Sequence, residues 1–215
     1  MTTTASLAYI IEVLEALFVA FNTHFFSGQL EKPVITASPK GRKNALGWCS
    51  CQKIWKEKGK EEYYYEINLC AEYLCRPFED VCKTLLHELI HLYNLQLGIR
   101  DCSRNGVYHN KHFKIAAEAN GLTCERHKTC GWAITALTRE TAEWLKETYG
   151  SNPGTFSIFR NSGGRLDEPD AENSDSSTSN SRRYVCPSCG TIVRATKVVN
   201  IICGDCREAF QQRER

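Results

Sequence analysis

Hydrophobic residues recur every three or four positions near the start of the chain, which predicts an amphipathic helix over residues 5–26. The apolar positions are Leu7, Ile10, Ile11, Leu14, Leu17, Phe18, Phe21 and Phe25. This spacing places them on one face of a helix, while Glu12 and Glu15 fall off that face. Gly28 is a plausible stop signal. We expect the wide, aromatic stripe to pack on a protein core.

The pattern then changes to short segments typical of strands, at residues 33–38, 45–53 and 62–69. The last of these alternates, so that its odd-numbered and even-numbered side chains face opposite ways. The charged residues 56–61 are predicted to form a hairpin loop. Cys49 and Cys51 lie two positions apart, so on a strand they would share an inward face.

A helical period returns in three later segments, residues 81–97, 109–120 and 139–149. Pro77 and Asp80 suit the opening turn of the first of these helices. Gly121 is typical of the residue that ends a helix. The polar stretch between the first two helices is predicted to be irregular.

The composition changes after these helices. Residues 151–181 are rich in Gly, Ser, Asn, Asp and Glu, which predicts a flexible acidic linker. Residues 181–215 hold seven basic side chains against three acidic ones, a net charge of +4. We therefore expect a main domain at 1–150 and a small basic module at 182–215. A basic module is compatible with a nucleic-acid partner, although a solvated surface is the simpler interpretation of the charge alone.

The whole chain has 215 residues, 42% of them hydrophobic, a net charge of +2 and twelve cysteines. The N-terminal apolar run contains acidic residues and lacks the basic leader of a secretory signal. No uncharged stretch approaches the roughly 18 residues of a membrane span. We expect a cytoplasmic protein without a membrane partner, whose cysteines are metal ligands or small core residues rather than disulfides. The expected core cysteines are Cys70, Cys75 and Cys82.

The sequence His87-Glu88-Leu89-Ile90-His91 lies inside the apolar segment 81–97. Residues four apart share a helix face, so both imidazoles reach one metal ion. Glu88 then lies beside the metal, where its carboxylate accepts a proton from a bound water. This HExxH arrangement is typical of zinc hydrolases, most often metalloproteases.

A catalytic zinc takes three protein ligands and keeps one position open. The third ligand should therefore lie downstream of His91. The residue types leave four candidates open: His109, His112, His127 and Glu118.

A second metal site is predicted near the C-terminus. The pairs Cys186-x-x-Cys189 and Cys203-x-x-Cys206 flank a short β-rich stretch. Four thiolates give a closed structural zinc site, and Gly190 and Gly204 suit its tight turns. A segment of this size folds only when a bound metal crosslinks it in this way.

Cys124, His127 and Cys130 form a third, less usual cluster, with Cys102 as a further candidate member. Buried or free thiols are the simpler interpretation of this spacing.

HELIH followed by Tyr108-His109-Asn110-Lys111-His112-Phe113 resembles the SprT-like, or Spartan-type, zinc metalloprotease family. Two upstream stretches, 17–30 and Leu46-Gly47-Trp48-Cys49, are also similar to the family's opening helix and strand, so the resemblance covers about residues 5–150. In this family a His-x-x-x-Phe element supplies the third ligand, which implies His109 with Phe113 packing beside it. The chain departs from the common pattern at Asn110, where many members carry Gly.

The resemblance implies an α+β, zincin-like protease domain with an N-terminal helix, a small antiparallel-type sheet and the HExxH helix, followed by a zinc ribbon. It implies a zinc endopeptidase with one catalytic and one structural zinc, acting on proteins or peptides. Zincin-type enzymes commonly bind substrate along a sheet edge, and strand 62–69 is our candidate. Tyr108 is a candidate oxyanion donor, and His112 is expected at the surface.

Eukaryotic relatives cleave proteins crosslinked to DNA, so DNA is a further candidate partner. Two other functions stay open. One is a nucleic-acid-binding regulatory protein with a vestigial HExxH site, and the other is a dedicated protease that cuts a single repressor.

Overall fold

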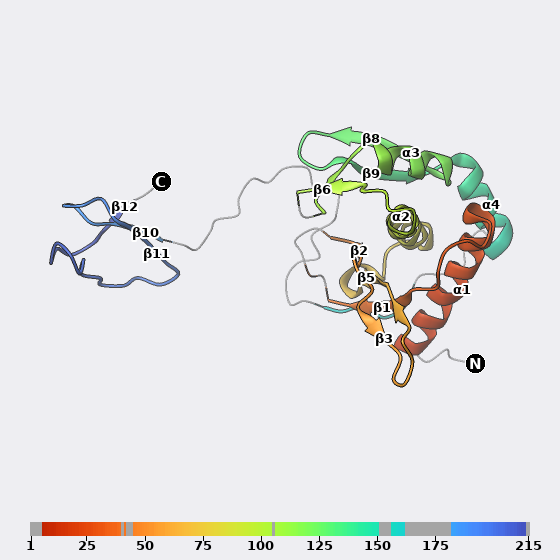
Figure 1. Cartoon of the computed structure of the whole chain (residues 1–215), viewed down its shortest axis with the longest axis horizontal. Helices are drawn as coiled ribbons and strands as arrows, with labels where there is room; N and C mark the ends of the chain where they lie inside the picture. Colours follow the sequence, from red (N-terminus) through yellow and green to blue (C-terminus); the bar gives the residue numbers. More distant parts are fainter. Residues whose placement is uncertain are drawn as a thin grey trace. The chain divides into compact units, whose positions relative to one another are not determined.

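The computed structural model describes residues 6–39, 41, 45–104, 106–150, 156–161 and 182–213. The chain divides into two compact units, Met1–Asp167 and Glu168–Arg215. We call them the large unit and the small unit (Figure 1). The large unit mixes four helices with short strands among its described residues, which confirms the predicted α+β class.

The predicted N-terminal helix is α1, Leu7–Phe26, and it begins where the Ser6 side chain accepts a hydrogen bond from the Ala8 N–H. The helix ends at Ser27, which has a positive φ of 53°. By length and composition α1 could cross a membrane. Its apolar stripe is nevertheless buried in the core of the large unit, as expected for a core helix; the buried residues are Ile10, Leu14, Leu17, Phe18, Phe21 and Phe26.

The first sheet has the strand order β1-β5-β2, with β1 at Val34–Ser38, β2 at Gly47–Cys49 and β5 at Glu66–Cys70. β5 is antiparallel to β2 but parallel to β1, so the expected antiparallel sheet is mixed. β5 is central and buried on both faces. The prediction that strand 62–69 offers the free edge is therefore wrong, and β2 is an edge strand.

The predicted strand 45–53 is interrupted after Cys49, because Ser50 turns its hydroxyl onto the Gln52 carbonyl at 2.7 Å. A separate hairpin follows, formed by β3, Trp55–Lys56, and β4, Tyr63–Tyr64. Its loop, residues 57–62, lies one residue later than the predicted 56–61. Cys49 packs against the core, but Cys51 is exposed, so the two thiols do not share an inward face.

A short 3₁₀ helix, Ala71–Tyr73, leads to α2, Phe78–Gln96, which carries the HExxH sequence. Pro77 precedes α2, and Glu79 and Asp80 lie in its first turn, where acids stabilise a helix. α2 runs through the large unit beside both sheets (Figure 1). Cys70 and Cys82 are buried as predicted, whereas Cys75 is only partly buried.

The helix predicted at 109–120 is shorter, α3 at Lys111–Ala119. Asn110 is its N-cap and accepts hydrogen bonds from the N–H groups of His112 and Phe113. His109 therefore lies in a strand before the helix, because a capping Asn has extended backbone. Gly121 has a φ of 86° directly after the helix, as predicted.

A second sheet was not predicted. Its order is β6-β7-β9-β8, with β6 at Cys102–Ser103, β7 at Tyr108–His109, β8 at Leu122–His127 and β9 at Gly131–Leu137. β8 and β9 pair antiparallel over most of their length. Cys124 and His127, considered above only as members of a less usual ligand cluster, lie on β8, and the alternation of β9 was not recognised.

The predicted last helix is α4, Arg139–Tyr149. Residues 156–161 then return to the large unit, where Phe156 is buried in the core and Arg160 pairs with Glu72 at 2.9 Å. These six residues lie inside the predicted linker but pack on the large unit, since Phe156 and Ile158 supply apolar contacts. The remaining linker residues, 151–155 and 162–181, lie outside the described part of the chain.

The small unit is a three-stranded antiparallel sheet of order β11-β10-β12. Its strands are β10, Arg182–Val185, β11, Ile192–Ala195, and β12, Gln211–Arg213. Gly190 has the positive φ expected of a tight turn, but at the second turn Arg207, not Gly204, takes that conformation, with a φ of 60°.

Candidate metal centre and catalytic site

Three imidazoles meet at one point of the large unit. His87 Nε2 and His91 Nε2 each lie 3.1 Å from His109 Nε2. The ligand atoms of all three residues lie within 4.8 Å of one another. His87 and His91 come from successive turns of α2, and His109 comes from β7.

β7 holds His109 in place through its backbone. The His109 N–H donates to the Cys130 carbonyl at 2.9 Å. Gly131 lies against the same strand with a φ of 69°, and a Cβ there would lie 2.1 Å from the His109 carbonyl oxygen. Only glycine permits this approach of β9 to β7, so Gly131 fixes the strand that carries His109.

Phe113 forms the floor beneath the three imidazoles. Its ring centroid lies 4.6 Å from that of His87, 4.7 Å from His91 and 4.5 Å from His109, and its side chain is fully buried. A rigid aromatic ring in contact with all three side chains restricts their rotation. Phe113 thus has the packing position that the family resemblance implied.

The outer ring nitrogens of two of the histidines have polar partners. Thr135 Oγ1 on β9 lies 3.2 Å from His87 Nδ1. Asp101 Oδ2 lies 2.8 Å from His91 Nδ1 and also accepts a hydrogen bond from the Asn94 side chain. Such contacts fix the tautomer and orientation of a metal-binding histidine. Asp101 was not predicted from the sequence, where its one signal is that it is the only acidic residue between His91 and His109.

The three imidazoles differ in how readily they carry a positive charge. Burial lowers the pKa of His87 well below its usual value and that of His109 to about 4, with their neighbouring histidines adding to the effect. Burial also opposes charge on His91, but hydrogen bonds to Asp101 and Cys102 raise its pKa to about 10. His91, which contacts Asp101, is therefore the ring of the three on which a positive charge is best stabilised.

A metal cation fits the same place. Three neutral imidazole nitrogens are ordinary zinc ligands, and Zn–N bonds of about 2.0–2.1 Å place the nitrogens of a tetrahedral site about 3.3 Å apart. The observed 3.1 Å separations are close to that value. His87, His91 and His109 are therefore the residues that would hold the ion.

Glu88 is on α2, and its side chain packs against the edge strand β2. It is buried, and its carboxylate accepts a hydrogen bond from the Cys49 N–H. A Cβ added to Gly47 would lie 3.2 Å from Glu88 Oε1, so β2 runs directly over the carboxylate. Burial raises the pKa of Glu88 to about 7, although the hydrogen bond and His91 oppose the shift.

The other candidates for the third ligand lie away from the cluster. His112 and His127 are exposed, and Glu118 forms an ion pair with Lys114 on α3. His112 is therefore at the surface, as expected. Tyr108 packs its ring near Arg104 and the backbone of Gly131.

The small unit brings its four cysteines together. The sulfur atoms of Cys186, Cys189, Cys203 and Cys206 all lie within 4.8 Å of one another. Each pair closes a similar turn: the Gly190 N–H donates to the Cys186 carbonyl, and the Arg207 N–H to the Cys203 carbonyl. The hydrogen bond from Thr191 is the main cause that lowers the pKa of Cys189 to about 6. The arrangement suits a tetrahedral thiolate site.

The third cysteine cluster is not assembled as a three-ligand group. His127 Nδ1 lies 3.4 Å from Cys130 Sγ, but Cys124 joins no metal-binding group among the described residues. Cys102 lies instead beside His91 and Asp101.

An HExxH helix below a small sheet, with a third histidine from a following strand, defines a zincin-like domain. The profile of the SprT-like family matches residues 14–129. The chain belongs to this family. It is also 38% identical over 112 residues to a human protein named "DNA-dependent metalloprotease SPRTN". That match covers 51% of this chain and 21% of the human protein.

Proposed function

We propose that this protein is a zinc-dependent endopeptidase that acts on proteins associated with nucleic acid. The observation that carries the proposal is the convergence of three imidazole nitrogens beside the buried carboxylate of Glu88. Membership of the SprT-like family supports a metalloprotease. The predicted cytoplasmic location stays a prediction.

In this proposal His87, His91 and His109 hold the catalytic zinc, and the four cysteines of the small unit hold a structural one. A bound catalytic zinc would supply a Lewis acid that polarises the scissile carbonyl and lowers the pKa of a water to about 7. All other steps are carried by side chains of this protein.

Glu88 moves the proton. A general base must lie within hydrogen-bond reach of the proton it abstracts, and the buried Glu88 carboxylate is held beside the three histidines by the Cys49 N–H. Its carboxylate takes a proton from the attacking water as the new C–O bond forms. It then passes that proton to the amide nitrogen as the C–N bond breaks. Asp101 keeps the His91 ring oriented throughout.

The substrate would lie along β2. Leu46 and Ser50 bond to β5, so in the alternating antiparallel pattern the backbone groups of Gly47 and the carbonyl of Cys49 face the free edge, while the Cys49 N–H donates to Glu88. An extended peptide pairing with this edge passes Glu88, to which Cys49 is already hydrogen bonded. Recognition through the backbone makes cleavage depend little on the amino-acid sequence of the substrate. Selectivity would therefore have to come from where the enzyme is bound.

The nucleic-acid part of the proposal is supported by the human relative, whose name describes a DNA-dependent metalloprotease. Because this chain spans only 21% of that protein's length, DNA dependence must be tested directly. The experiment compares wild type with Glu88→Gln, which keeps the shape of the side chain and removes the base.

Each protein is incubated with zinc and a DNA-binding protein, with and without single-stranded DNA. The proposal predicts DNA-stimulated cleavage by wild type and none by Glu88→Gln. Cleavage by wild type at one site, unaffected by DNA, would point instead to a dedicated regulatory protease. DNA binding without cleavage by zinc-loaded wild type would point to a regulatory binding protein.

A further inference from the structure

A third group of metal-binding side chains lies directly behind the histidine centre. Among the described residues three such groups come together: the three histidines, the four cysteines, and His91 with Asp101 and Cys102. In the last group a ring nitrogen, a carboxylate oxygen and a sulfur lie within 4.8 Å of one another. The proposed catalytic cycle uses His91 and Asp101, whereas the thiol of Cys102 has no part in it.

The register of the second sheet directs Cys102 toward His91. Cys102 of β6 is directly opposite His109 of β7, and directly opposed residues of antiparallel strands project from the same face. Both side chains therefore reach the His91 ring, but at opposite nitrogens. His109 Nε2 lies 3.1 Å from Nε2 of His91, and the Cys102 sulfur lies 4.0 Å from Nδ1.

Asp101 brings a carboxylate to the same nitrogen as Cys102. Its Oδ2 lies 2.8 Å from His91 Nδ1 and accepts a hydrogen bond from the Asn94 amide at 3.0 Å. Asn94 is almost fully buried, so it holds the carboxylate in place independently of the proton on His91. Asp101 is thus already positioned to act as a ligand.

A tetrahedral zinc ion fits between these three atoms. Zn–N and Zn–O bonds of about 2.0–2.2 Å and a Zn–S bond of about 2.3 Å put the ligand atoms about 3.3–3.6 Å apart. The distances from His91 Nδ1 to the Asp101 oxygen and to the Cys102 sulfur, 2.8 and 4.0 Å, lie on either side of that range. Side-chain shifts of about 0.5 Å would therefore complete the geometry.

The ligand types indicate which cation binds. Nitrogen, sulfur and carboxylate oxygen are all zinc ligands, whereas Ca²⁺ and Mg²⁺ prefer oxygen. The carboxylate and the thiolate carry two negative charges, which balance a divalent cation. Binding releases two protons to solvent, one from the Cys102 sulfur and one from His91 Nδ1.

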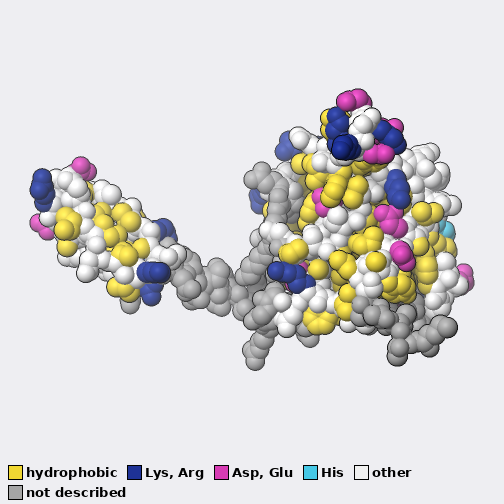
Figure 2. Space-filling model, turned by 90° about the horizontal axis from the view of Figure 1, so that it is seen from below, with side chains coloured by type: hydrophobic (Ala, Val, Ile, Leu, Met, Phe, Trp, Pro, Cys, Tyr) yellow, Lys and Arg dark blue, Asp and Glu magenta, His cyan; other side chains and the backbone are white. Residues whose placement is uncertain are grey.

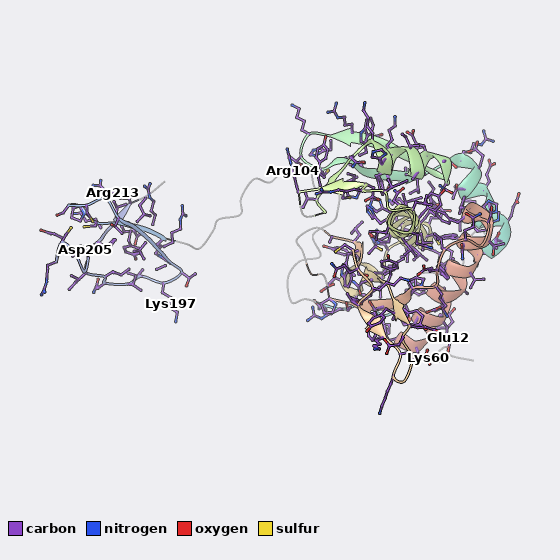
Figure 3. All side chains as sticks on the ribbon, in the orientation of Figure 1. Glu12, Lys60, Arg104, Lys197, Asp205 and Arg213 are labelled. Carbon is purple, nitrogen blue, oxygen red and sulfur yellow. The ribbon has the colours of Figure 1, made fainter. Side chains whose placement is uncertain are left out.

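Solvent reaches this group from the side of β6. β6 is an edge strand of the second sheet, and Cys102 is partly exposed. Figure 3 shows Arg104, two residues further along the chain, at the outer margin of the large unit. On the face of the large unit seen in Figure 2, acidic side chains are interspersed with basic ones, so those acids are less available to bind a cation.

We propose that His91 Nδ1, Asp101 and Cys102 form a regulatory site for a second zinc ion in the large unit, and that this ion inhibits the peptidase when free zinc is high. Two cations held by one ring repel each other. This site is therefore weaker than the three-histidine centre and fills only when zinc is in excess. As purified, the chain should hold zinc in the other two groups alone.

Inhibition follows from what the added ion displaces. It takes the place of the proton between His91 and Asp101, so the carboxylate no longer orients the ring for the catalytic centre. Loss of such an orienting contact impairs both metal binding and activity. The inhibition rests on the proposed peptidase function, whereas the metal site itself does not.

Equilibrium dialysis of the zinc-loaded, full-length protein against a series of buffered free zinc concentrations tests the site directly. Zinc per chain, measured by mass spectrometry, should rise from two to three in wild type, one ion for each group. Cys102→Ser should stay at two over the range in which wild type fills the third site. Cys102 is the residue to change, because His91 and Asp101 also serve the catalytic centre.

The matched control is Cys130→Ser. The Cys130 thiol is also partly buried and lies 3.4 Å from a histidine nitrogen, His127 Nδ1, but no third ligand joins this pair among the described residues. This variant should take up the third ion as wild type does. Two ions retained by Cys102→Ser at low free zinc show that its other two metal sites are intact.

Peptidase activity is measured over the same zinc series. In wild type, half-inhibition should occur at the free zinc concentration that half-fills the third site. In Cys102→Ser it should require at least about tenfold more zinc, since losing even an indirect partner of a metal ligand weakens binding about 10- to 100-fold. Ca²⁺ and Mg²⁺ at the same concentrations should not inhibit.

The proposal is overturned if wild type takes up no third ion. A third ion that Cys102→Ser binds as tightly as wild type, or that Cys130→Ser loses, would be an adventitious ion only. Filling of the third site without loss of activity would overturn the regulatory role. A third ion that depends on Cys102, in a protein that cleaves nothing at any zinc concentration, would instead refute the proposed peptidase function and leave the metal site standing.

Discussion

Asp101 Oδ2 lies 2.8 Å from Nδ1 of His91, the ring nitrogen opposite the one that meets His109. The Asp101 carbonyl also accepts a hydrogen bond from the Asn110 N–H at 2.9 Å. One residue therefore orients a ring on α2 and holds the end of the strand that carries His109. It couples the two parts of the metal centre.

Replacing Asp101 with Asn should weaken zinc binding about 10- to 100-fold, the usual cost of losing a carboxylate behind a metal-binding histidine. Competition with a chromophoric chelator measures the affinity. Asp80→Asn removes a carboxylate from the first turn of α2 and should leave the affinity unchanged. Equal zinc affinity in Asp101→Asn and wild type would show that the contact with His91 has no role in the site.

Replacing Phe113 with Ala should destabilise the large unit by about 3–5 kcal/mol, because it opens a cavity under the three histidines. Urea denaturation followed by tryptophan fluorescence measures this change. Ile115→Ala, on the exposed face of the same helix, should cost less than about 1 kcal/mol. A loss of stability no larger than that of Ile115→Ala would contradict the packing role of Phe113.

A methyl group at Gly47 would lie 2.8 Å from the Asn68 carbonyl oxygen and 3.2 Å from Cγ of Glu88. Because Asn68 O is backbone and cannot easily move, Gly47→Ala should shift β2 and Glu88. We expect at least a tenfold loss of peptidase activity with zinc content retained, since displacement of a catalytic group is costly. Gly59→Ala, in the open hairpin loop, is the control. Unchanged activity in Gly47→Ala would show that the position of β2 does not affect the catalytic site.

Removing zinc from the small unit should unfold it, because a segment of about 35 residues has too little core to fold alone. Cys203→Ser should abolish its zinc site and the dispersion of its amide NMR signals. Cys51→Ser changes an exposed thiol outside the site and should preserve them. Native signals from residues 182–213 in Cys203→Ser would mean that the fold does not depend on the metal.

The sequence predicts best those features that depend on local spacing. α1 and α4 follow from apolar periodicity, and the placement of His87 and His91 on one side of α2 follows from their separation by four residues. The cluster of four cysteines in the small unit is likewise predicted by two Cys-x-x-Cys repeats.

Features that depend on contacts between distant segments could not be predicted in this way. The second sheet joins β7 to β9 through a single parallel register pair, His109 with Gly131, and no local pattern encodes that pairing. The contact between Asp101 and His91 depends on how the chain turns after α2. The order of the first sheet, which makes β2 rather than residues 62–69 the free edge, is likewise set by tertiary packing.

The most direct test of the three-histidine centre is the zinc content of purified wild type, His109→Ala and His112→Ala. The two histidines are three residues apart, but only His109 lies with His87 and His91. We predict two zinc ions per chain for wild type and for His112→Ala, and one for His109→Ala. Two ions retained in His109→Ala, or one lost in His112→Ala, would contradict the site described above.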